Sequence, residues 1–182
     1  MTEIMKLSPI MNRYILHWGE MGTKWGVNRS VAQIHALLYI GGRPLPAEEI
    51  AELLSIARSN VSNGLKELQG WGIVRVAHTL GDRRDHFEAL SDVWETFRHI
   101  LTERKRRESD PTLRLLRDCV AEAAGIPRPT ADDVRTRKRL EEMLEFFELA
   151  NAWGERASGF SPRALRRFAK MGDAIFKLAG GE

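Results

Sequence analysis

Cysteine is nearly absent from this chain of 182 residues, which contains only Cys119. A single thiol excludes an internal disulfide and any thiolate-rich metal site. Cys119 falls in the apolar pattern of a helix, and we interpret it as a small buried hydrophobic residue rather than a redox sensor. The five histidines show no metal-ligand spacing. We therefore expect neither a metal nor another cofactor.

Long apolar runs are also absent. The first ten residues contain no uninterrupted apolar segment of the kind that a signal peptide needs, and no later run approaches the roughly 20 residues that span a membrane. We expect a cytoplasmic protein that does not contact a membrane. Positive charge is limited too, because the formal net charge is only +3 although the pI is about 9.2. Any surface that binds nucleic acid must then be a local patch.

Sequence motifs of enzymes are missing. The chain has no glycine-rich nucleotide-binding loop, no paired histidines of a zinc protease, and no plausible Cys–His or Ser–His arrangement. The adjacent carboxylates Asp132-Asp133 and Glu141-Glu142 fall on predicted helix surfaces, where such residues favour solubility and complement helix dipoles. We expect a protein that is not an enzyme.

What the chain does contain is helical periodicity, with an apolar fraction of 43% that is sufficient for a core. A first helix is predicted to begin at Ser8-Pro9 and to end at Gly22. A second helix, capped by Asn28 or Ser30, is predicted to stop at Gly41-Gly42. Its predicted inward residues recur at helical spacing: Val31, Ile34, Leu37 and Leu38.

The stretch from Leu45 to Leu90 carries the most specific pattern. It predicts a short helix from about Pro46, a turn at 55–57, and a second helix over 58–70 with Val61, Leu65 and Leu68 on its buried face. Val74–Val76 then alternates as a half-buried strand, Gly81-Asp82 supplies a turn, and 86–89 returns as a second strand, which could bring His78 opposite His86. This order of elements is a winged helix-turn-helix.

The remainder is predicted to be entirely helical. Ser91 is expected to cap a long helix, Asp110-Pro111 to restart it after a break, Gly125 to close it, and Pro127–Pro129 to form a linker before a helix from about Ala131. A last helix opens at Ser161-Pro162 and ends at Gly180-Gly181. The apolar residues expected to face inward in these helices are Val93, Trp94, Phe97, Ile100, Leu101, Leu113, Leu116, Cys119, Val120, Ala123, Leu140, Met143, Leu144, Phe147, Ala150, Leu165, Phe168, Gly172, Ile175 and Phe176.

The predicted fold class is therefore mainly α with a small β-hairpin wing. Residues 1–90 form the N-terminal helix and a winged helix-turn-helix DNA-binding domain, and residues 91–182 form a helical dimerisation or regulatory region. The N-terminal helix and the helices after Ser91 carry more apolar surface than one small domain needs. We expect that surplus to build a dimer interface.

The second helix of the central stretch carries the candidate site. At 100° per residue, Ser59, Asn63 and Lys66 point away from the buried face, and Asn60 flanks them. Asparagine can bond adenine through two hydrogen bonds, whereas lysine and serine reach guanine or phosphate. A merely solvated helix face is the alternative, and the two arginines of the wing weigh against it. The candidate DNA contacts are Arg58, Ser59, Asn60, Ser62, Asn63, Lys66, Arg83 and Arg84.

The same residues carry a family resemblance. The segments EEIAELLSIARSNVSNGLKELQGWGIV and GDRRDHFEAL, with NRSVAQI upstream, resemble the MarR superfamily of winged-helix regulators, and more closely its GbsR-like branch. The resemblance covers about the first half of the chain. It implies a homodimeric transcriptional regulator whose wing arginine, here Arg83, enters the minor groove, with Arg84 nearby for phosphate.

Three residues depart from the family pattern. Ala57 stands where many such helices have a capping serine or threonine, so the recognition helix could start one or two residues later. Ser55 replaces the frequent turn glycine. Gly64 lies within the recognition helix at a cost of about 1 kcal/mol against alanine, and either close packing or adaptability on DNA would explain it.

Two features outside the central stretch have alternative interpretations. Tyr14, Trp18, Trp25, Trp71 and Trp94 could form an aromatic cage for a quaternary ammonium effector such as choline, or could simply pack in the core and interfaces; we favour packing. The basic run 104–107 could contact DNA beside the main site or could be a solvated helix end, and we favour the helix end.

The sequence thus predicts a DNA-binding transcriptional regulator, a repressor rather than an activator, that binds a pseudo-palindromic operator as a homodimer. Half-sites would be spaced by about 10 base pairs. Control by a small-molecule effector is left open. The alternative is a winged helix used as a protein–protein interaction scaffold without sequence-specific DNA binding, and exposed apolar residues on the recognition helix would favour it.

Overall fold

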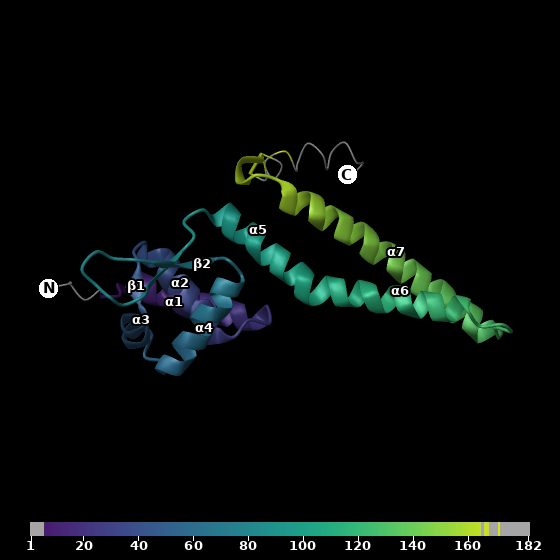
Figure 1. Cartoon of the computed structure of the whole chain (residues 1–182), viewed down its shortest axis with the longest axis horizontal. Helices are drawn as coiled ribbons and strands as arrows, with labels where there is room; N and C mark the ends of the chain where they lie inside the picture. Colours follow the sequence, from purple (N-terminus) through teal and green to yellow (C-terminus); the bar gives the residue numbers. More distant parts are fainter. Residues whose placement is uncertain (1–5, 165, 168–170, 172–182) are drawn as a thin grey trace. The chain divides into compact units, whose positions relative to one another are not determined.

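The computed structural model describes residues 6–164, 166–167 and 171 of the chain. Chain contacts divide it into two compact units, residues 1–96 and 97–182, and each is described by itself. The fold is mainly helical with one small antiparallel sheet (Figure 1), as the predicted fold class requires. No helix among the described residues is both long and apolar enough to cross a membrane.

Unit 1 contains four complete helices and a three-stranded sheet within the described residues. In chain order these are α1 (Pro9–Lys24), α2 (Arg29–Gly41), β1 (Leu45–Pro46), α3 (Ala47–Leu54), α4 (Arg58–Gly70), β2 (Val74–Ala77) and β3 (His86–Ala89). The side chains that form its core come from all four helices, the sheet and the residue before β2. The largest of them that are almost fully buried are Ile34, Leu37, Leu38, Leu45, Ile50, Val61, Leu68 and Ile73.

The first two helices follow their predicted caps but not every predicted end. The Ser8 hydroxyl accepts a hydrogen bond from the Met11 N–H (3.2 Å), and the Asn28 side chain accepts one from the Ser30 N–H (2.8 Å). The prediction that Gly22 ends α1 is wrong, because α1 continues to Lys24. Gly22 is buried instead, and a Cβ at this position would lie 2.5 Å from Ala32 Cβ. Its role is therefore the close approach of α1 to α2.

The turn between α3 and α4 resolves two of the departures from the family pattern. Ser55 adopts a left-handed conformation with φ 52°, the conformation that favours glycine at this position. Ala57 is the N-cap of α4 and offers no side-chain cap, yet α4 still begins at Arg58. The missing cap does not delay the helix, because tertiary packing rather than capping fixes most helices in proteins.

The sheet has the strand order β1-β3-β2, and all pairs are antiparallel. The sequence prediction missed β1, which pairs Leu45 with Phe87 and Pro46 with His86. Pro46 is tolerated because a two-residue edge strand needs few of its own N–H donors. Val76 is 37% exposed, so the predicted half-buried alternation of β2 fails at that residue.

The predicted pairing of two histidines across the wing is also wrong. His86 pairs with Ala77 in the sheet register and is buried, whereas His78 lies beyond the paired residues and is exposed. A strand turns successive side chains to opposite faces, and the hairpin register places no histidine opposite His86.

The helix α5 (Val93–Arg104) spans the division between the units, and two predictions about it are wrong. Its cap is Asp92 rather than Ser91: the Asp92 Oδ1 accepts hydrogen bonds from the N–H groups of Trp94 (2.7 Å) and Glu95 (3.2 Å). Val93 and Phe97 are 53% and 48% exposed rather than inward-facing.

Unit 2 continues from α5 through a π-helical turn, η1 (Lys105–Ser109), into α6 (Asp110–Ala124), and then returns in α7 (Ala131–Gly159). The predicted break at Asp110-Pro111 is absent, because the Asp110 N–H bonds the carbonyl of Lys105 in the wider π turn. Proline lacks an N–H and crowds the preceding turn, and a widened turn accommodates it without ending the helix.

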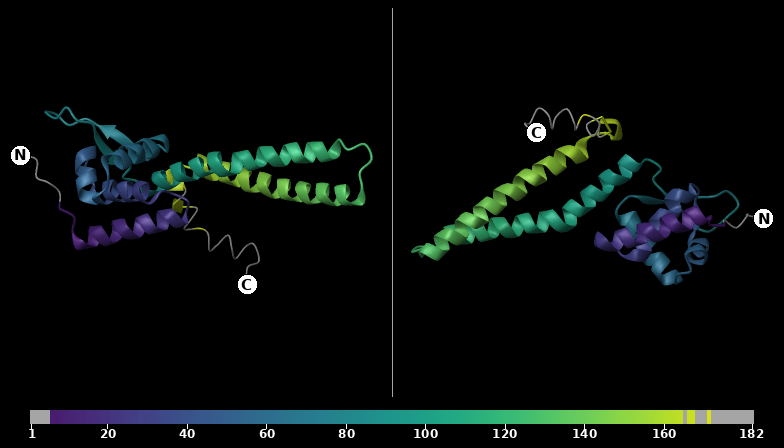
Figure 2. Two further views of the ribbon diagram at one scale, coloured as in Figure 1. Left: turned by 90° about the horizontal axis from the view of Figure 1, so that it is seen from below. Right: turned by 180° about the vertical axis from the view of Figure 1, so that it is seen from behind.

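The helices α6 and α7 lie antiparallel and side by side (Figure 2). The linker between them follows Gly125, and Thr130 caps the N-terminus of α7 by exchanging hydrogen bonds with Asp133 (2.7–3.2 Å). Met143 and Ala150 were predicted to face inward but are exposed, since α7 covers only one of its faces against α6 and η1 in the described part of unit 2.

The predicted last helix opens as expected, with the Ser161 hydroxyl accepting from the Ala164 N–H (3.2 Å). The residues predicted to line it lie outside the described residues: Leu165, Phe168, Gly172, Ile175 and Phe176.

Candidate nucleic-acid interface

The helix α4 has one buried face and one polar face. Val61, Leu65 and Leu68 are at most 2% exposed and anchor the helix against the core of unit 1. The predicted DNA contacts on this helix all lie on exposed positions: Arg58, Ser59, Asn60, Ser62, Asn63 and Lys66. The helical period therefore divides the residues of α4 as the sequence predicted, and the exposed face presents no apolar side chain.

Gly64 explains how close α4 lies to its neighbour α2. It is buried, and a Cβ at this position would lie 2.7 Å from Ile34 Cδ1. Real Cβ atoms do not approach other heavy atoms so closely, so alanine would require Ile34 to move. Of the two explanations that the sequence left open, the structure supports close packing.

Arg58 is oriented by the preceding helix. Its guanidinium forms an ion pair with the Glu48 carboxylate at the start of α3. Both groups are well exposed (72% and 36%), and such pairs contribute little stability in water. The pair holds Arg58 beside the N-terminus of α4, and a phosphate there would compete with Glu48 for the same guanidinium.

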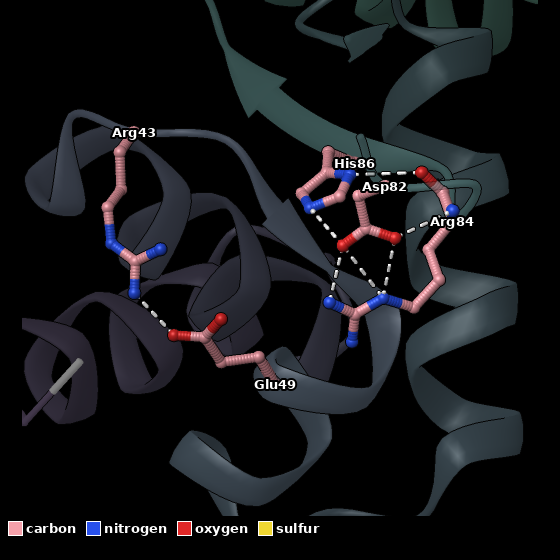
Figure 3. A network of polar contacts seen from close by, with 5 residues as sticks. All are labelled: Arg43, Glu49, Asp82, Arg84 and His86. Atoms are coloured by element: carbon pink, nitrogen blue, oxygen red, sulfur yellow. Dashed lines mark hydrogen bonds and ion pairs between the residues drawn. The ribbon is translucent and has the colours of Figure 1, made fainter. Parts of the chain in front are cut away.

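The wing contains a compact polar network around Asp82 (Figure 3). Its Oδ1 accepts hydrogen bonds from the backbone N–H and the Nε of Arg84, both at 3.0 Å, and its Oδ2 accepts from Nε at 3.0 Å and Nη2 at 2.5 Å. These hydrogen bonds from Arg84 hold the pKa of the Asp82 carboxyl well below its usual range. One aspartate therefore fixes both the backbone and the side chain of Arg84.

His86 completes this network from β3. Its Nδ1 lies 3.0 Å from the carbonyl oxygen of Arg84, and its Nε2 lies 3.5 Å from Asp82 Oδ2. The hydrogen bonds that Arg84 donates to Asp82 raise the pKa of Arg84, and the charges of Glu48 and Glu49 add to the effect. The base of the wing thus lies within electrostatic reach of the start of α3, where Glu49 pairs with Arg43 (Figure 3).

The tip of the wing is a turn over residues 79–82. The Asp82 N–H bonds the Thr79 carbonyl at 3.1 Å, and Gly81 has a φ of 86°. Arg83, which follows the turn, is exposed and forms no ion pair with another described residue. Leu80 is fully exposed, and sequence reasoning did not single it out, because one leucine between polar residues carries no periodic signal. The two predicted wing arginines therefore differ: Arg84 is held by Asp82, and Arg83 is not.

The aromatic residues that could form a cage are partly gathered on α1 and the loop after it. Three of the five aromatic residues pack together: Tyr14 stacks on Trp18 (5.6 Å between ring centroids), and Trp25 meets Trp18 edge-on (6.0 Å). These rings contact one another at the surface and not in the core, because Trp25 is 51% exposed.

The basic run of unit 2 is matched by local carboxylates. Lys105 lies 2.7 Å from Asp110, Arg106 lies 2.5 Å from Glu103, and Arg104 lies 3.9 Å from Glu108. The neighbouring carboxylates neutralise much of the charge of the run, as expected for a solvated helix surface.

Comparison with known proteins gives a family for the central stretch. Residues 25–85 match the model of the MarR family, which supports the MarR superfamily for the segment that contains α2, α3, α4 and most of the wing. No curated protein matches the chain.

One solved structure agrees in fold with most of this chain. A crystal structure described as a transcriptional regulator is 17% identical, with a TM-score of 0.63 over 83% of this chain and 97% of that one. This likeness shows the fold alone. YusO from Bacillus subtilis is 19% identical (75% and 84% covered, TM-score 0.36), and NadR in complex with 4-hydroxyphenylacetate is 20% identical (69% and 99% covered, TM-score 0.37). The chain thus shares the fold of the first of these structures.

Proposed function

We propose that this chain is a transcriptional repressor of the MarR superfamily, in its GbsR-like branch, that acts in the cytoplasm and binds double-stranded DNA as a homodimer. The observation that carries the proposal is the exposed face of α4. Six predicted contact residues are exposed there on a helix whose other face is fixed by buried Val61, Leu65 and Leu68. A helix that presents only hydrogen-bonding and cationic groups suits the major groove.

Each part of the interface has a separate task in this proposal. Asn60 and Asn63 bond base edges and supply sequence preference. Phosphate and guanine contacts that fix the register of the helix come from Arg58, Ser59, Ser62 and Lys66. Arg83 enters the minor groove beside each half-site. That Arg84 also reaches phosphate stays a prediction, and its guanidinium would have to share or leave Asp82 to do so.

The homodimer is supported by an apolar stripe on α7. Phe146, Leu149 and Trp153 are 57–63% exposed, and their spacing of three and four residues places them on one side of the helix. This stripe is distinct from the side chains that pack against α6. A second copy of the chain is the partner that we propose for it, because one winged helix reads too few base pairs and a two-fold dimer doubles the site.

Repression follows from occupancy of DNA. A dimer that covers two half-sites about 10 base pairs apart excludes other proteins from that segment, and this requires no further contact surface. A protein–protein scaffold would instead be expected to expose apolar side chains on α4, and the exposed positions of α4 carry none.

Selection from a pool of random DNA duplexes tests the proposal. Full-length protein should enrich a pseudo-palindrome with two half-sites one helical turn apart, and Asn63→Ala should enrich a less defined sequence. If no sequence is enriched and binding to every duplex is equally weak, the protein does not bind DNA sequence-specifically and the scaffold function would replace this proposal.

A further inference from the structure

The wing tip presents one large apolar side chain to solvent. Leu80 has a relative exposure of 104%, so no other part of the described chain covers it. The exposed residues around it are polar or lack a side chain: His78, Thr79, Gly81, Arg83, Arg84 and Asp85. Figure 2 shows the loop between β2 and β3 reaching beyond the helices of unit 1. A leucine at this place has no role in the core of its own unit.

The backbone holds Leu80 at the corner of the turn. Leu80 and Gly81 are the two central residues between the Thr79 carbonyl and the Asp82 N–H, which are 3.1 Å apart. The φ of 86° at Gly81 is the value that a type II turn requires at its third position. The Asp82 carboxylate also binds the backbone N–H of Arg84 at 3.0 Å. The turn is therefore anchored on the side that follows Leu80.

Leu80 has no exposed apolar neighbour in the wing turn, and this limits the kind of macromolecule that it can contact. A protein partner needs an apolar patch of several side chains to bind stably, and the wing tip offers one leucine next to an arginine. A minor groove of DNA is about 6 Å wide, which admits a single side chain between its deoxyribose walls. Proteins that enter this groove combine arginine with single apolar side chains, leucine included.

We propose that Leu80 is a DNA-contacting residue of the wing. It packs against the deoxyribose walls of the minor groove at the outer edge of each half-site, while the neighbouring Arg83 supplies the charge. The inference rests on the proposed DNA-binding function and adds to it an uncharged, apolar contact. Such a contact favours base-pair steps at which the minor groove widens or the bases unstack easily. Leu80 therefore contributes a sequence preference outside the bases that α4 contacts.

Binding measured by fluorescence anisotropy on the duplex enriched by selection, over a series of salt concentrations, tests this inference. Leu80→Ala is expected to weaken binding about tenfold while leaving the dependence on salt unchanged, because leucine releases no counterion. Leu80→Met, which keeps a flexible apolar side chain of similar size, should retain most of the affinity. The matched control is Thr79→Ala in the same turn, which should bind like the natural protein.

The outcomes separate this inference from the proposed function. If the natural protein enriches no duplex, the proposed function fails. If it binds an enriched duplex and Leu80→Ala binds equally well, the proposed function stands and the role of Leu80 is overturned. A loss of affinity that Thr79→Ala shares would also overturn it, since the turn as a whole and not the leucine would then be responsible.

Discussion

Both oxygens of the Asp82 carboxylate accept hydrogen bonds from the Arg84 guanidinium: Nε lies 3.0 Å from Oδ1 and from Oδ2, and Nη2 lies 2.5 Å from Oδ2. The preceding residue, Arg83, forms no ion pair within the described residues and is exposed. Two adjacent arginines that look equivalent in the sequence therefore differ in what they can offer DNA. Arg84 shapes the wing, and Arg83 is available for a new partner.

The first prediction separates these two arginines by the salt dependence of DNA binding. Arg83→Ala should reduce the slope of the logarithm of affinity against the logarithm of salt concentration by about one, since one phosphate-neutralising charge is lost. Arg84→Ala should weaken binding and reduce the slope by less than one, because its guanidinium would be shared between Asp82 and a phosphate. Equal reductions of the slope in the two variants would contradict this difference between the arginines.

The second prediction concerns the partnership of Asp82 with Arg84. Asp82→Ala should weaken DNA binding at least as much as Arg84→Ala, because Asp82 also binds the backbone N–H of Arg84. The double variant should be no weaker than Asp82→Ala, because the interaction of the two side chains is already lost in that variant. Fluorescence anisotropy on one duplex at one salt concentration gives the DNA affinities of the natural protein, the two single variants and the double variant. Additive losses would mean that the two residues act independently.

The third prediction uses the buried His35. Burial lowers its pKa to about 4, whereas an unfolded histidine titrates near ~6.5. Between these values the unfolded chain binds a proton that the folded chain does not, so stability is present above the unfolded pKa and is lost as the pH falls toward the folded one. The free energy of unfolding should fall by about 3 kcal/mol over this range.

His35→Leu should remove most of this pH dependence. The His35 Nε2 is buried without a hydrogen-bond partner among the described residues, so an apolar side chain leaves no donor or acceptor unsatisfied. Urea unfolding at a series of pH values gives the comparison, and His78→Gln on the exposed wing is the control that should keep the natural profile. If the free energy of unfolding of His35→Leu depends on pH as steeply as that of the natural protein, other groups cause the dependence.

The fourth prediction tests the packing of Gly64 against Ile34. Gly64→Ala should destabilise the protein by about 1 kcal/mol, since the steric cost of overpacking exceeds the gain in helix propensity. Ile34→Val removes the Cδ1 that a new Cβ would meet at 2.7 Å, so it should restore part of the stability in the Gly64→Ala background. Alone, it should cost about 1 kcal/mol. Additive effects would contradict the contact.

The fifth prediction addresses the homodimer. Trp153→Lys combined with Phe146→Lys should convert the dimer into a monomer, because a charge cannot be buried in an apolar interface without a partner. Thr136→Lys places the same side chain on an exposed position of α7 that does not share the side of the stripe, and it should leave the dimer intact. Size-exclusion chromatography with light scattering reports the mass. A natural protein that is monomeric at micromolar concentration would contradict the proposal at once.

Much of unit 1 could be predicted because its signals are local. Helical period predicts the bounds of α4. Glycines that favour positive φ values predict the end of α2 and the turn of the wing. The faces of α4 followed for the same reason, since 100° per residue fixes which side chains share a side.

The misses arise where tertiary context overrides a local signal. The sequence predicts a helix end at Gly22, but this glycine lies inside α1, where Ala32 of α2 approaches it closely. The sequence predicts a break in the helix at Pro111, but a π-helical turn accommodates this proline. The partnership of Asp82 with Arg84 and the full exposure of Leu80 depend on side-chain positions in a loop, for which a sequence has no periodicity to offer.

The measurement that tests the central claim most directly compares the natural protein with Asn63→Ala on two duplexes, the enriched sequence and a scrambled version of it. The account predicts that the natural protein binds the enriched duplex at least about a thousandfold more tightly. Asn63→Ala should lose about 1–3 kcal/mol of that preference while binding the scrambled duplex as before. Equal affinity of the natural protein for both duplexes would contradict the account.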